Sequence, residues 1–225
     1  MTPLARILAR QIAATGPITL ADYMAACLSH PEHGYYATRD PLGAAGDFTT
    51  APEISQTFGE MLGLALAQAW LHQGRPAPFV LAELGPGRGT LMADALRATR
   101  AVPGFTDAAQ VHLVETSPTL RASQAQTLGE AQPQWHDSVE TLPDAPLFLV
   151  ANEFFDALPI RQFQRLGDGW AERMVGLEGD RLVLGQASAT RIAALEHRLA
   201  DTPDGGIVET CAPAQAIAQE IGARV

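Results

Sequence analysis

The sequence of 225 residues predicts an α/β fold in which a parallel sheet follows N-terminal helices and is interrupted by an antiparallel β insertion. Three observations carry this prediction. Apolar strand patterns alternate with helical patterns from Phe79 onward, which is typical of a parallel sheet with right-handed crossovers. Helical periodicity dominates the chain before Phe79, and short Gly-Asp turns separate polar strands after Pro159. We therefore expect an N-terminal part, residues 1–76, and a core, residues 77–225, with the insertion at about 160–186.

The N-terminal part is expected to hold helices and one long loop. Residues 1 to about 30 look helical with a break at Gly16-Pro17, and Thr19 is suited to cap the second helix. The apolar face of the first helix is formed by Leu4, Ile7, Leu8 and Ile12. The segment PEHGYYATRDPLGAAGDFTTAPEIS follows, and a further helix then runs to Gly74. A loop of about 25 residues is usually functional or disordered, and the aromatic residues in it favour order.

The core is expected to repeat a strand–turn–helix pattern. The expected strands are FVLAEL, QVHLVE, the weaker PQWHD, and APLFLVANE. Helices are expected over TLMADALRATR and SPTLRASQAQTL, the second with Ser117 as N-cap and Pro118 at its first position. After the insertion, the patterns predict a helix over ATRIAALEHRLA, a short strand over GGIVET and a final helix over APAQAIAQEIGARV.

The composition excludes several function classes. The net charge of −10 argues against binding to nucleic acid or to an anionic membrane surface. All 15 basic residues are arginines, which excludes a P-loop lysine, a pyridoxal Schiff base and a lysine general base. Cys27 and Cys211 form no C-x-x-C pair, so neither a disulfide framework nor a zinc knuckle is expected. Without a membrane-spanning run or a signal-type N-terminus, we expect a soluble protein of the cytosol.

The turn after the first core strand points to a particular cofactor. Its glycines follow the pattern Glu-x-Gly-x-Gly-x-Gly from Glu83, and Thr90 stands where the dinucleotide fingerprint needs a glycine. A carboxylate at Glu83 would repel a pyrophosphate but attract a cation, and S-adenosylmethionine carries a sulfonium and an ammonium without any phosphate. Glu115 ends the second strand 30 residues after Gly85, where an acid can accept both ribose hydroxyls. The alternative is that Glu115 only caps the following helix.

These features resemble class I S-adenosylmethionine-dependent methyltransferases, and longer motifs narrow the resemblance. HPEHGYY, DPLGAAGDFTTAPEISQTFGEMLG, LAELGPGRGTL and ANEFFDALPIRQF occur in this order. Together they are similar to the MidA family, which includes the mitochondrial complex I assembly-factor methyltransferase, and the match runs from about Leu4 to the last helix. The resemblance implies a Rossmann-like class I methyltransferase fold with extra N-terminal elements. Because the family continues past the final helix into further strands, we expect the sheet to be incomplete at the C-terminus.

The resemblance also implies roles for individual residues. The methionine end of the cofactor would be lined by Glu83, Gly85, Pro86, Gly87 and Gly89. Glu115 would bind the ribose, and Asp137 is a candidate for the adenine amino group or, alternatively, a turn aspartate. A lid over the cofactor is implied for Gly46, Asp47, Phe48 and Thr49. His30 and His33 have no evident third ligand, so no metal site is expected.

The candidate catalytic residues lie in NEFFDALP, at the carboxyl end of the fourth strand, where ligands bind in open α/β sheets. Asn152 is placed to meet the cofactor or the methyl acceptor. Glu153 and Asp156 could hold a guanidinium group by bidentate hydrogen bonds. The alternative is an Asx-type turn at Asn152 and a helix-start charge at Glu153, while Phe154 and Phe155 are expected to pack.

The leading functional hypothesis is a methyltransferase that uses S-adenosylmethionine, releases S-adenosylhomocysteine and methylates protein arginine in connection with complex I assembly. The expected partner is a protein with an arginine acceptor, such as a complex I subunit, and not nucleic acid. One alternative is an assembly factor that binds the cofactor without catalysis, and another is methylation of a small molecule. The resemblance implies the mitochondrial matrix for a eukaryotic chain and the cytoplasm for a bacterial one.

Overall fold

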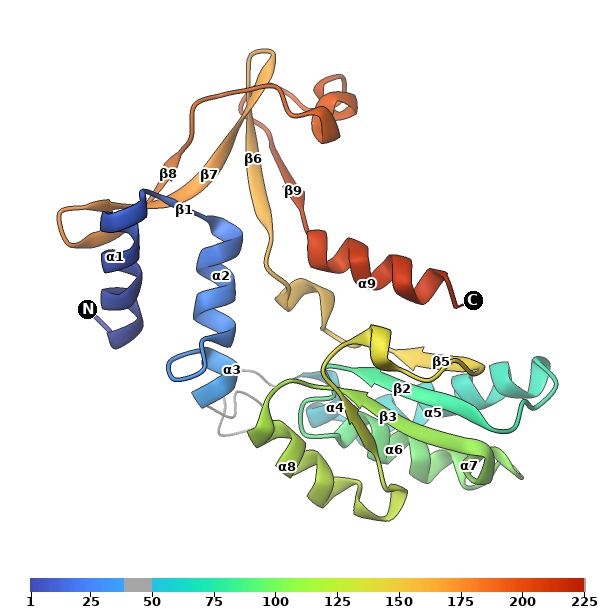
Figure 1. Cartoon of the computed structure of the whole chain (residues 1–225). Coiled ribbons are helices and arrows are strands. Elements are labelled where there is room, and N and C mark those ends of the chain that lie inside the picture. The colour runs from blue at the N-terminus through green and yellow to red at the C-terminus, as the bar shows by residue number, and fades with distance from the viewer. Residues whose placement is uncertain (39–49, 225) are drawn as a thin grey trace. The chain divides into compact units, whose positions relative to one another are not determined.

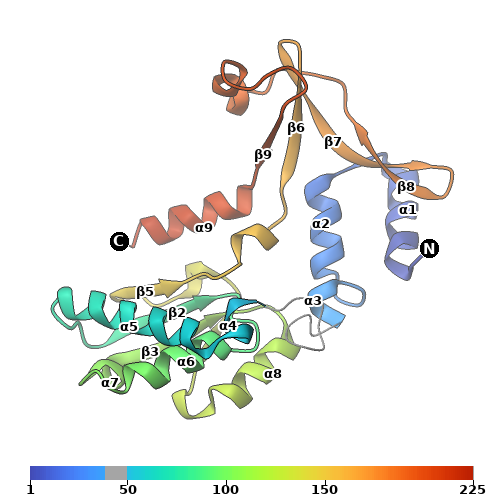
Figure 2. The same ribbon diagram turned by 180° about the vertical axis from the view of Figure 1, so that it is seen from behind.

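The computed structural model describes residues 1–38 and 50–224, and the predicted lid residues Gly46, Asp47, Phe48 and Thr49 lie outside this range. The chain forms two compact units, which we call the first and the second unit (Figures 1 and 2). The first unit combines Met1–Thr38 with Leu158–Gln215, and the second combines Arg39–Ala157 with Ala216–Val225. The β insertion thus groups with the N-terminal helices, because the N-terminal strand β1 (Ile18–Thr19) pairs with β7 (Gly169–Glu178) of the insertion.

The second unit is built on a four-stranded parallel sheet. Its strands are β2 (Phe79–Leu84), β3 (Ala109–Val114), β4 (Gln134–His136) and β5 (Leu147–Val150). Their order is β4-β3-β2-β5, and each neighbouring pair is parallel. All four expected core strands are therefore present, and the predicted α/β class is confirmed.

The second unit also contains five α-helices among its described residues before β4, of which α5, α6 and α8 were predicted. They are α4 (Ala51–Ile54), α5 (Gln56–His72), α6 (Thr90–Thr99), α7 (Phe105–Ala108) and α8 (Pro118–Thr127). At the start of α8 the Ser117 hydroxyl accepts a hydrogen bond from the Leu120 N–H, as its N-cap assignment predicts. Helices α5 and α6 pack closely, because a Cβ atom on Gly63 would lie 2.6 Å from the Ala95 Cα atom.

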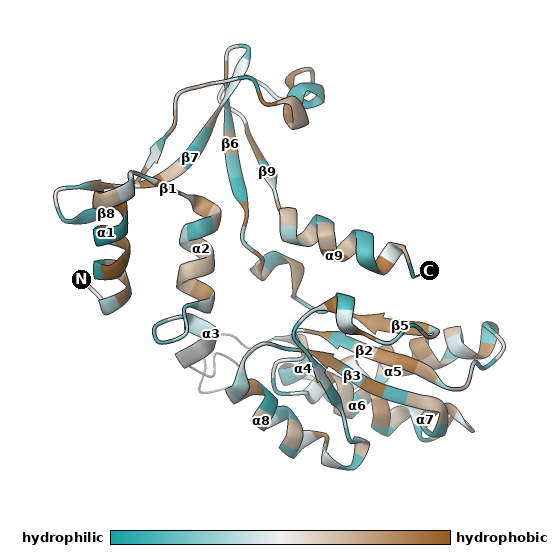
Figure 3. Ribbon diagram, viewed as in Figure 1, coloured by the Kyte–Doolittle hydropathy of each residue, from teal (hydrophilic) through white to brown (hydrophobic). Residues whose placement is uncertain are grey.

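Both faces of β2 are buried, which explains why all its residues except Glu83 are apolar (Figure 3). Phe79 and Leu81 face an aromatic cluster in which the Phe79 ring lies 5.0 Å from Phe105 and 5.1 Å from Phe148. Val80, Ala82 and Leu84 face the opposite layer, and helix α9 (Ala212–Gly222) contributes Ile217 and Ile221 to it. The alternation of a strand places Glu83 on the same face as Phe79 and Leu81.

The first unit contains a five-stranded antiparallel sheet and short helices. Its helices are α1 (Pro3–Thr15), α2 (Leu20–Ser29) and α3 (Tyr35–Thr38). Strands β1, β7, β6 (Arg161–Leu166) and β9 (Ile207–Thr210) follow one another in the sheet, and β8 (Arg181–Gln186) pairs with β7. The Thr19 hydroxyl accepts from the Asp22 N–H and caps α2 as expected. Leu8 and Ile12 of α1 are buried against Ile18 and Val175.

One predicted helix is wrong. The segment 189–200 forms only the 3-10 helix η4 (Ala193–Leu199), and Thr190 forms an antiparallel β-bridge with Trp170 instead. The Thr190 backbone exchanges two hydrogen bonds with Trp170, of 2.9 and 3.0 Å, so the chain enters η4 from an extended conformation. Across the two described ranges, no helix combines the length and the apolarity that crossing a bilayer requires.

Candidate active site

The sequence-predicted site residues of the second unit gather at the carboxyl edge of the parallel sheet. The strand register pairs Glu83 with Val150, Leu84 with Val114, and Val114 with His136. The four strands therefore end within one residue of the same level. The glycine turn, residues 85–89, follows β2, and Glu115 and Asp137 follow β3 and β4, while Asn152 lies two residues beyond the end of β5. This is the edge at which open α/β sheets bind their ligands.

The turn between β2 and α6 depends on glycine. Gly85, Gly87 and Gly89 have φ values of +60°, +55° and +84°, which L-residues with a side chain rarely adopt. The Gly85 N–H donates to the Val114 carbonyl over 3.0 Å, so the turn continues the hydrogen bonding of the sheet. Gly89 precedes α6 and has no side chain to cap it, and in the first turn of α6 the Met92 N–H donates to Glu83. The first N–H groups of a helix have no partner within the helix, so the start of α6 is suited to an external acceptor.

The NEFFDALP segment packs directly onto this turn. A Cβ atom on Gly85 would lie 2.8 Å from the Phe154 Cδ2 atom. The Phe154 ring also meets Phe155 edge to face at 5.3 Å. Phe154 thus packs as expected, whereas Phe155 is 38% exposed. Glu153, between Asn152 and Phe154, has a φ of +48°, an uncommon conformation for a residue with a side chain.

We expect Gly85→Ala to destabilise the protein by about 1–3 kcal/mol, because it adds both a strained φ and a clash with Phe154. The measurement is a urea titration that gives the free energy of unfolding. Gly129→Ala is the matched control, since no heavy atom lies within 4 Å of the added Cβ, and it should change stability by less than about 0.5 kcal/mol. Equal stabilities of the two variants would contradict the expected clash.

Glu83 is the most unusual ionisable group of the site. Its side chain is 3% exposed, and its Oε2 atom has no hydrogen-bond partner among the described residues. Burial raises the pKa of the Glu83 carboxyl to about 8, although a hydrogen bond from the Met92 N–H acts in the opposite direction. The carboxyl group is thus neutral around pH 7, and a bound cation would favour its ionised form.

Glu115 is held by the start of the following helix. Its Oε1 atom accepts a hydrogen bond of 2.8 Å from the Ser117 N–H, and its Oε2 atom accepts one of 3.3 Å from the Gln124 side chain. Burial raises the pKa of the Glu115 carboxyl above its usual range. The capping alternative therefore describes part of what Glu115 does, but a carboxylate has about four acceptor positions, and a ribose diol could use the others.

Asp137 lies immediately after β4 and has an exposed side chain. It forms an ion pair with Arg121, whose Nε atom donates a 2.7 Å hydrogen bond to the Glu115 carbonyl. Asn152 is half-buried, while Glu153 and Asp156 are exposed beyond the end of β5. The adenine and acceptor roles of these residues remain predictions.

Two residues of this edge were missed by the sequence analysis. Glu53 of α4 accepts a 2.6 Å hydrogen bond from the Thr90 hydroxyl and lies 3.7 Å from the Arg88 guanidinium, so it contacts the glycine turn. The fully buried Gln124 of α8 donates a hydrogen bond to the Gly87 carbonyl in the same turn. A signal for each was present in the sequence. Glu53 lies within the long motif DPLGAAGDFTTAPEISQTFGEMLG. Gln124 is a polar residue on the inward face of a predicted helix.

The histidines proposed to have no metal role lie in the first unit. The rings of His30 and His33 stack with their centroids 5.2 Å apart. Within residues 1–38 and 50–224, no group of three or more His, Cys, Asp or Glu side chains is arranged to hold a metal ion.

The chain is similar to known methyltransferases in sequence and in structure. The family model Methyltransf_28, which describes S-adenosyl-L-methionine-dependent methyltransferases, matches residues 61–225. The mitochondrial protein arginine methyltransferase NDUFAF7 of Danio rerio is 39% identical over 97% of this chain and 58% of its own length. The Homo sapiens protein of the same name is 37% identical over 100% of this chain and 57% of its own length.

A solved structure from Burkholderia thailandensis, bound to S-adenosyl-homocysteine, matches with a TM-score of 0.81 and 32% identity. The match covers 98% of this chain and 59% of that one. The chain thus spans somewhat more than half the length of the relatives that it matches.

Proposed function

The chain belongs to the MidA family of S-adenosyl-L-methionine-dependent methyltransferases, and from this premise we propose that its second unit binds the cofactor at the carboxyl edge of the sheet and methylates protein arginine. The observation that carries the proposal is the gathering of Glu83, the glycine turn and Glu115 at this edge. When bound, S-adenosylmethionine supplies an electrophilic methyl group on a sulfonium. The residues present fit this group, because the Glu83 oxygen without a partner suits a cation.

The roles that we propose for the cofactor residues are supported by their positions. The glycine turn and the N-terminus of α6 accommodate the methionine end, where backbone donors suit its carboxylate. Glu83 faces the cationic part, and Glu115 accepts the ribose hydroxyls with the lone pairs that Ser117, Thr116 and Gln124 leave free. Asp137, after the next strand, is proposed to contact the adenine amino group.

The acceptor is proposed to be an arginine side chain. Glu153 and Asp156 are exposed acids beyond β5, where a carboxylate can bind a guanidinium and stabilise the charge that it keeps during transfer. Most of the acidic excess of the chain also lies in the second unit. Asn152 would help to align the acceptor nitrogen with the methyl carbon, since in-line geometry supplies much of the acceleration. The relatives named as mitochondrial arginine methyltransferases support this class of acceptor, and a complex I subunit is the specific protein proposed.

The test is calorimetric titration of the 225-residue chain with S-adenosylhomocysteine, with NAD as the alternative ligand. We expect micromolar binding of S-adenosylhomocysteine, no binding of NAD, and a loss of at least about tenfold in Glu115→Ala, because hydrogen bonds to a charged group contribute about 1.5–3 kcal/mol. Glu115→Gln keeps an acceptor for the Ser117 N–H, so it separates the loss of charge from the loss of the cap. Binding of NAD, or none by the folded wild type, would contradict the proposal.

A further inference from the structure

Gln124 is a buried polar residue that belongs to neither the glycine turn nor a strand end. It lies on the inner face of α8 with no exposed surface. Its Nε2 atom donates a 2.7 Å hydrogen bond to the Gly87 carbonyl and a 3.3 Å hydrogen bond to Glu115 Oε2. Its Oε1 atom accepts a 2.8 Å hydrogen bond from the Trp135 indole. One side chain thus joins the glycine turn, the end of β3 and strand β4.

The orientation of the Gln124 amide is determined by chemistry. An indole N–H can only donate, so the amide oxygen must face Trp135 and the amide nitrogen must face the other two groups. Those two groups, a carbonyl and a carboxylate, can only accept. A flipped amide would place two donors together on one side and three acceptors on the other, so the observed orientation is the only one that satisfies all partners.

We propose that Gln124 is a positioning residue of the cofactor site, which holds the Gly87 carbonyl and the Glu115 carboxylate in one fixed arrangement so that the methionine and ribose ends are bound together. The inference rests on the proposed function. Gly87 has a φ of +55° in a turn of three glycines, where an unrestrained peptide could rotate. Because the C=O and N–H of a trans peptide point in opposite directions, fixing this carbonyl toward α8 also sets the direction of the next N–H.

The packing of α8 supports the same role. A Cβ atom on Gly89 would lie 3.2 Å from Leu128 Cδ1 and 3.6 Å from Gln124 Cα, so the helix backs closely onto the turn. Glu115 is held from two directions, by Ser117 at one oxygen and by Gln124 at the other. The remaining lone pairs of its carboxylate therefore have defined directions before any ligand arrives, which lowers the ordering cost of binding.

The experiment compares Gln124→Met and Gln124→Glu with Gln126→Met and Gln126→Glu. Gln126 lies on the same helix but is exposed, so its variants are matched controls. Affinity for S-adenosylhomocysteine is measured by calorimetry between pH 5.5 and 8, relative to the wild type at each pH. Gln124→Met should bind at least about tenfold more weakly, since it releases both the carbonyl and the carboxylate. Neither Gln126 variant should change the affinity by more than about twofold.

Gln124→Glu provides a readout that packing alone would not produce. In this variant the new carboxyl group at position 124 contacts the Glu115 carboxyl group, and such a pair carries one negative charge more readily than two. At low pH the side chain at position 124 is therefore protonated and can still donate a hydrogen bond to Glu115. The affinity of this variant relative to the wild type should therefore fall as pH rises. Trp135→Phe removes the donor to Gln124 Oε1 together with part of the ring that packs against the core. It should weaken binding while the protein stays folded, and it is the variant to use if Gln124→Met does not fold.

Wild-type affinity in folded Gln124→Met, or a pH-independent loss in Gln124→Glu, would overturn the positioning role. A wild type that binds no S-adenosylhomocysteine would instead overturn the proposed function, so the two failures are distinguishable.

Discussion

Without cofactor, Glu83→Gln should be more stable than the wild type at pH 8 and nearly equal to it at pH 5. The reason is that burial raises the pKa of the Glu83 carboxyl to about 8 in the folded protein, from 4.5 when unperturbed. Between these values the folded state holds a proton that the unfolded state releases, so the free energy of unfolding of the wild type falls as pH rises. Each pH unit in this window costs about 1.4 kcal/mol.

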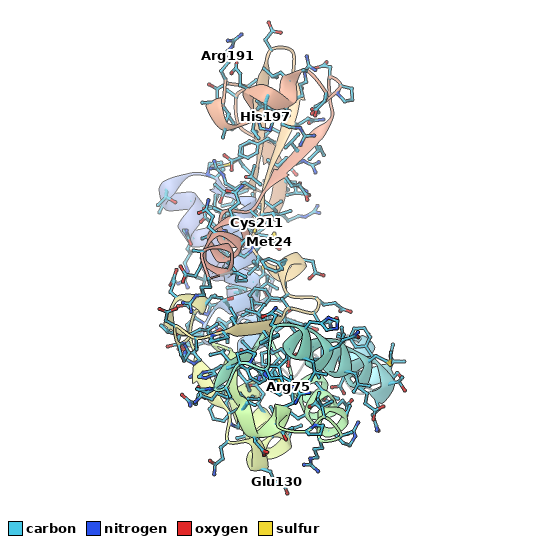
Figure 4. All side chains as sticks on the ribbon, turned by 90° about the vertical axis from the view of Figure 1, so that its right-hand side faces the viewer. Met24, Arg75, Glu130, Arg191, His197 and Cys211 are labelled. Atoms are coloured by element: carbon cyan, nitrogen blue, oxygen red, sulfur yellow. The ribbon has the colours of Figure 1, made fainter. Side chains whose placement is uncertain are left out.

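Glutamine keeps the acceptor for the Met92 N–H but cannot ionise, so this pH dependence should disappear in Glu83→Gln. The measurement is urea unfolding of both proteins from pH 5 to pH 9. Glu130→Gln is the control, because the Glu130 side chain is 93% exposed and projects from the second unit (Figure 4). If Glu83→Gln and the wild type lose stability in parallel above pH 5, Glu83 does not hold a proton in the folded state.

The same substitution should weaken cofactor binding by about tenfold or more, because the cation loses its charged partner. Glu83 would then stabilise the complex at the expense of the free protein, a trade-off that is common at functional sites. In the wild type, binding of a cationic ligand near pH 7 should release a proton, which appears as a dependence of the calorimetric heat on the buffer. A stabilised variant with unchanged affinity would separate Glu83 from the cofactor.

The double variant Glu153→Gln/Asp156→Asn should lose methyl transfer to an arginine-containing peptide by at least about a hundredfold in kcat/KM, while its affinity for S-adenosylhomocysteine changes less than about twofold. Two charge-assisted hydrogen bonds to the guanidinium, at about 1.5–3 kcal/mol each, account for this magnitude. The measurement is transfer of a radiolabelled methyl group, together with calorimetry. Both acids are exposed, so the variant should fold normally.

Asp107→Asn/Asp144→Asn is the matched control for charge. Both aspartates are exposed and precede β3 and β5, at the amino end of the sheet, so the net charge changes equally but at the opposite edge. Full activity in the Glu153/Asp156 variant would show that these acids do not bind the acceptor. A wild type that binds the cofactor but transfers no methyl group to any acceptor would favour the assembly-factor alternative.

The sequence by itself determined the strands of the second unit and the acids at their ends. Buried parallel strands are short apolar runs, which makes them recognisable in the sequence. Because the carboxyl ends of parallel strands meet at one edge of the sheet, the sequence alone places Glu83, Glu115 and Asp137 near one another. The caps at Thr19 and Ser117 were equally predictable, because a cap acts on N–H groups two or three residues away.

Only the tertiary structure decided which contacts support that edge and which groups are charged. Gln124 lies 37 residues from Gly87 in the glycine turn, and Glu53 lies 37 residues from Thr90 at the start of α6. No local pattern encodes such a pairing. The grouping of the β insertion with the N-terminal helices likewise depends on the pairing of β1 with β7. The proton on Glu83 is a consequence of burial, which packing from several elements creates together. These properties depend on contacts between distant residues, whereas strands, turns and caps depend on neighbours along the chain.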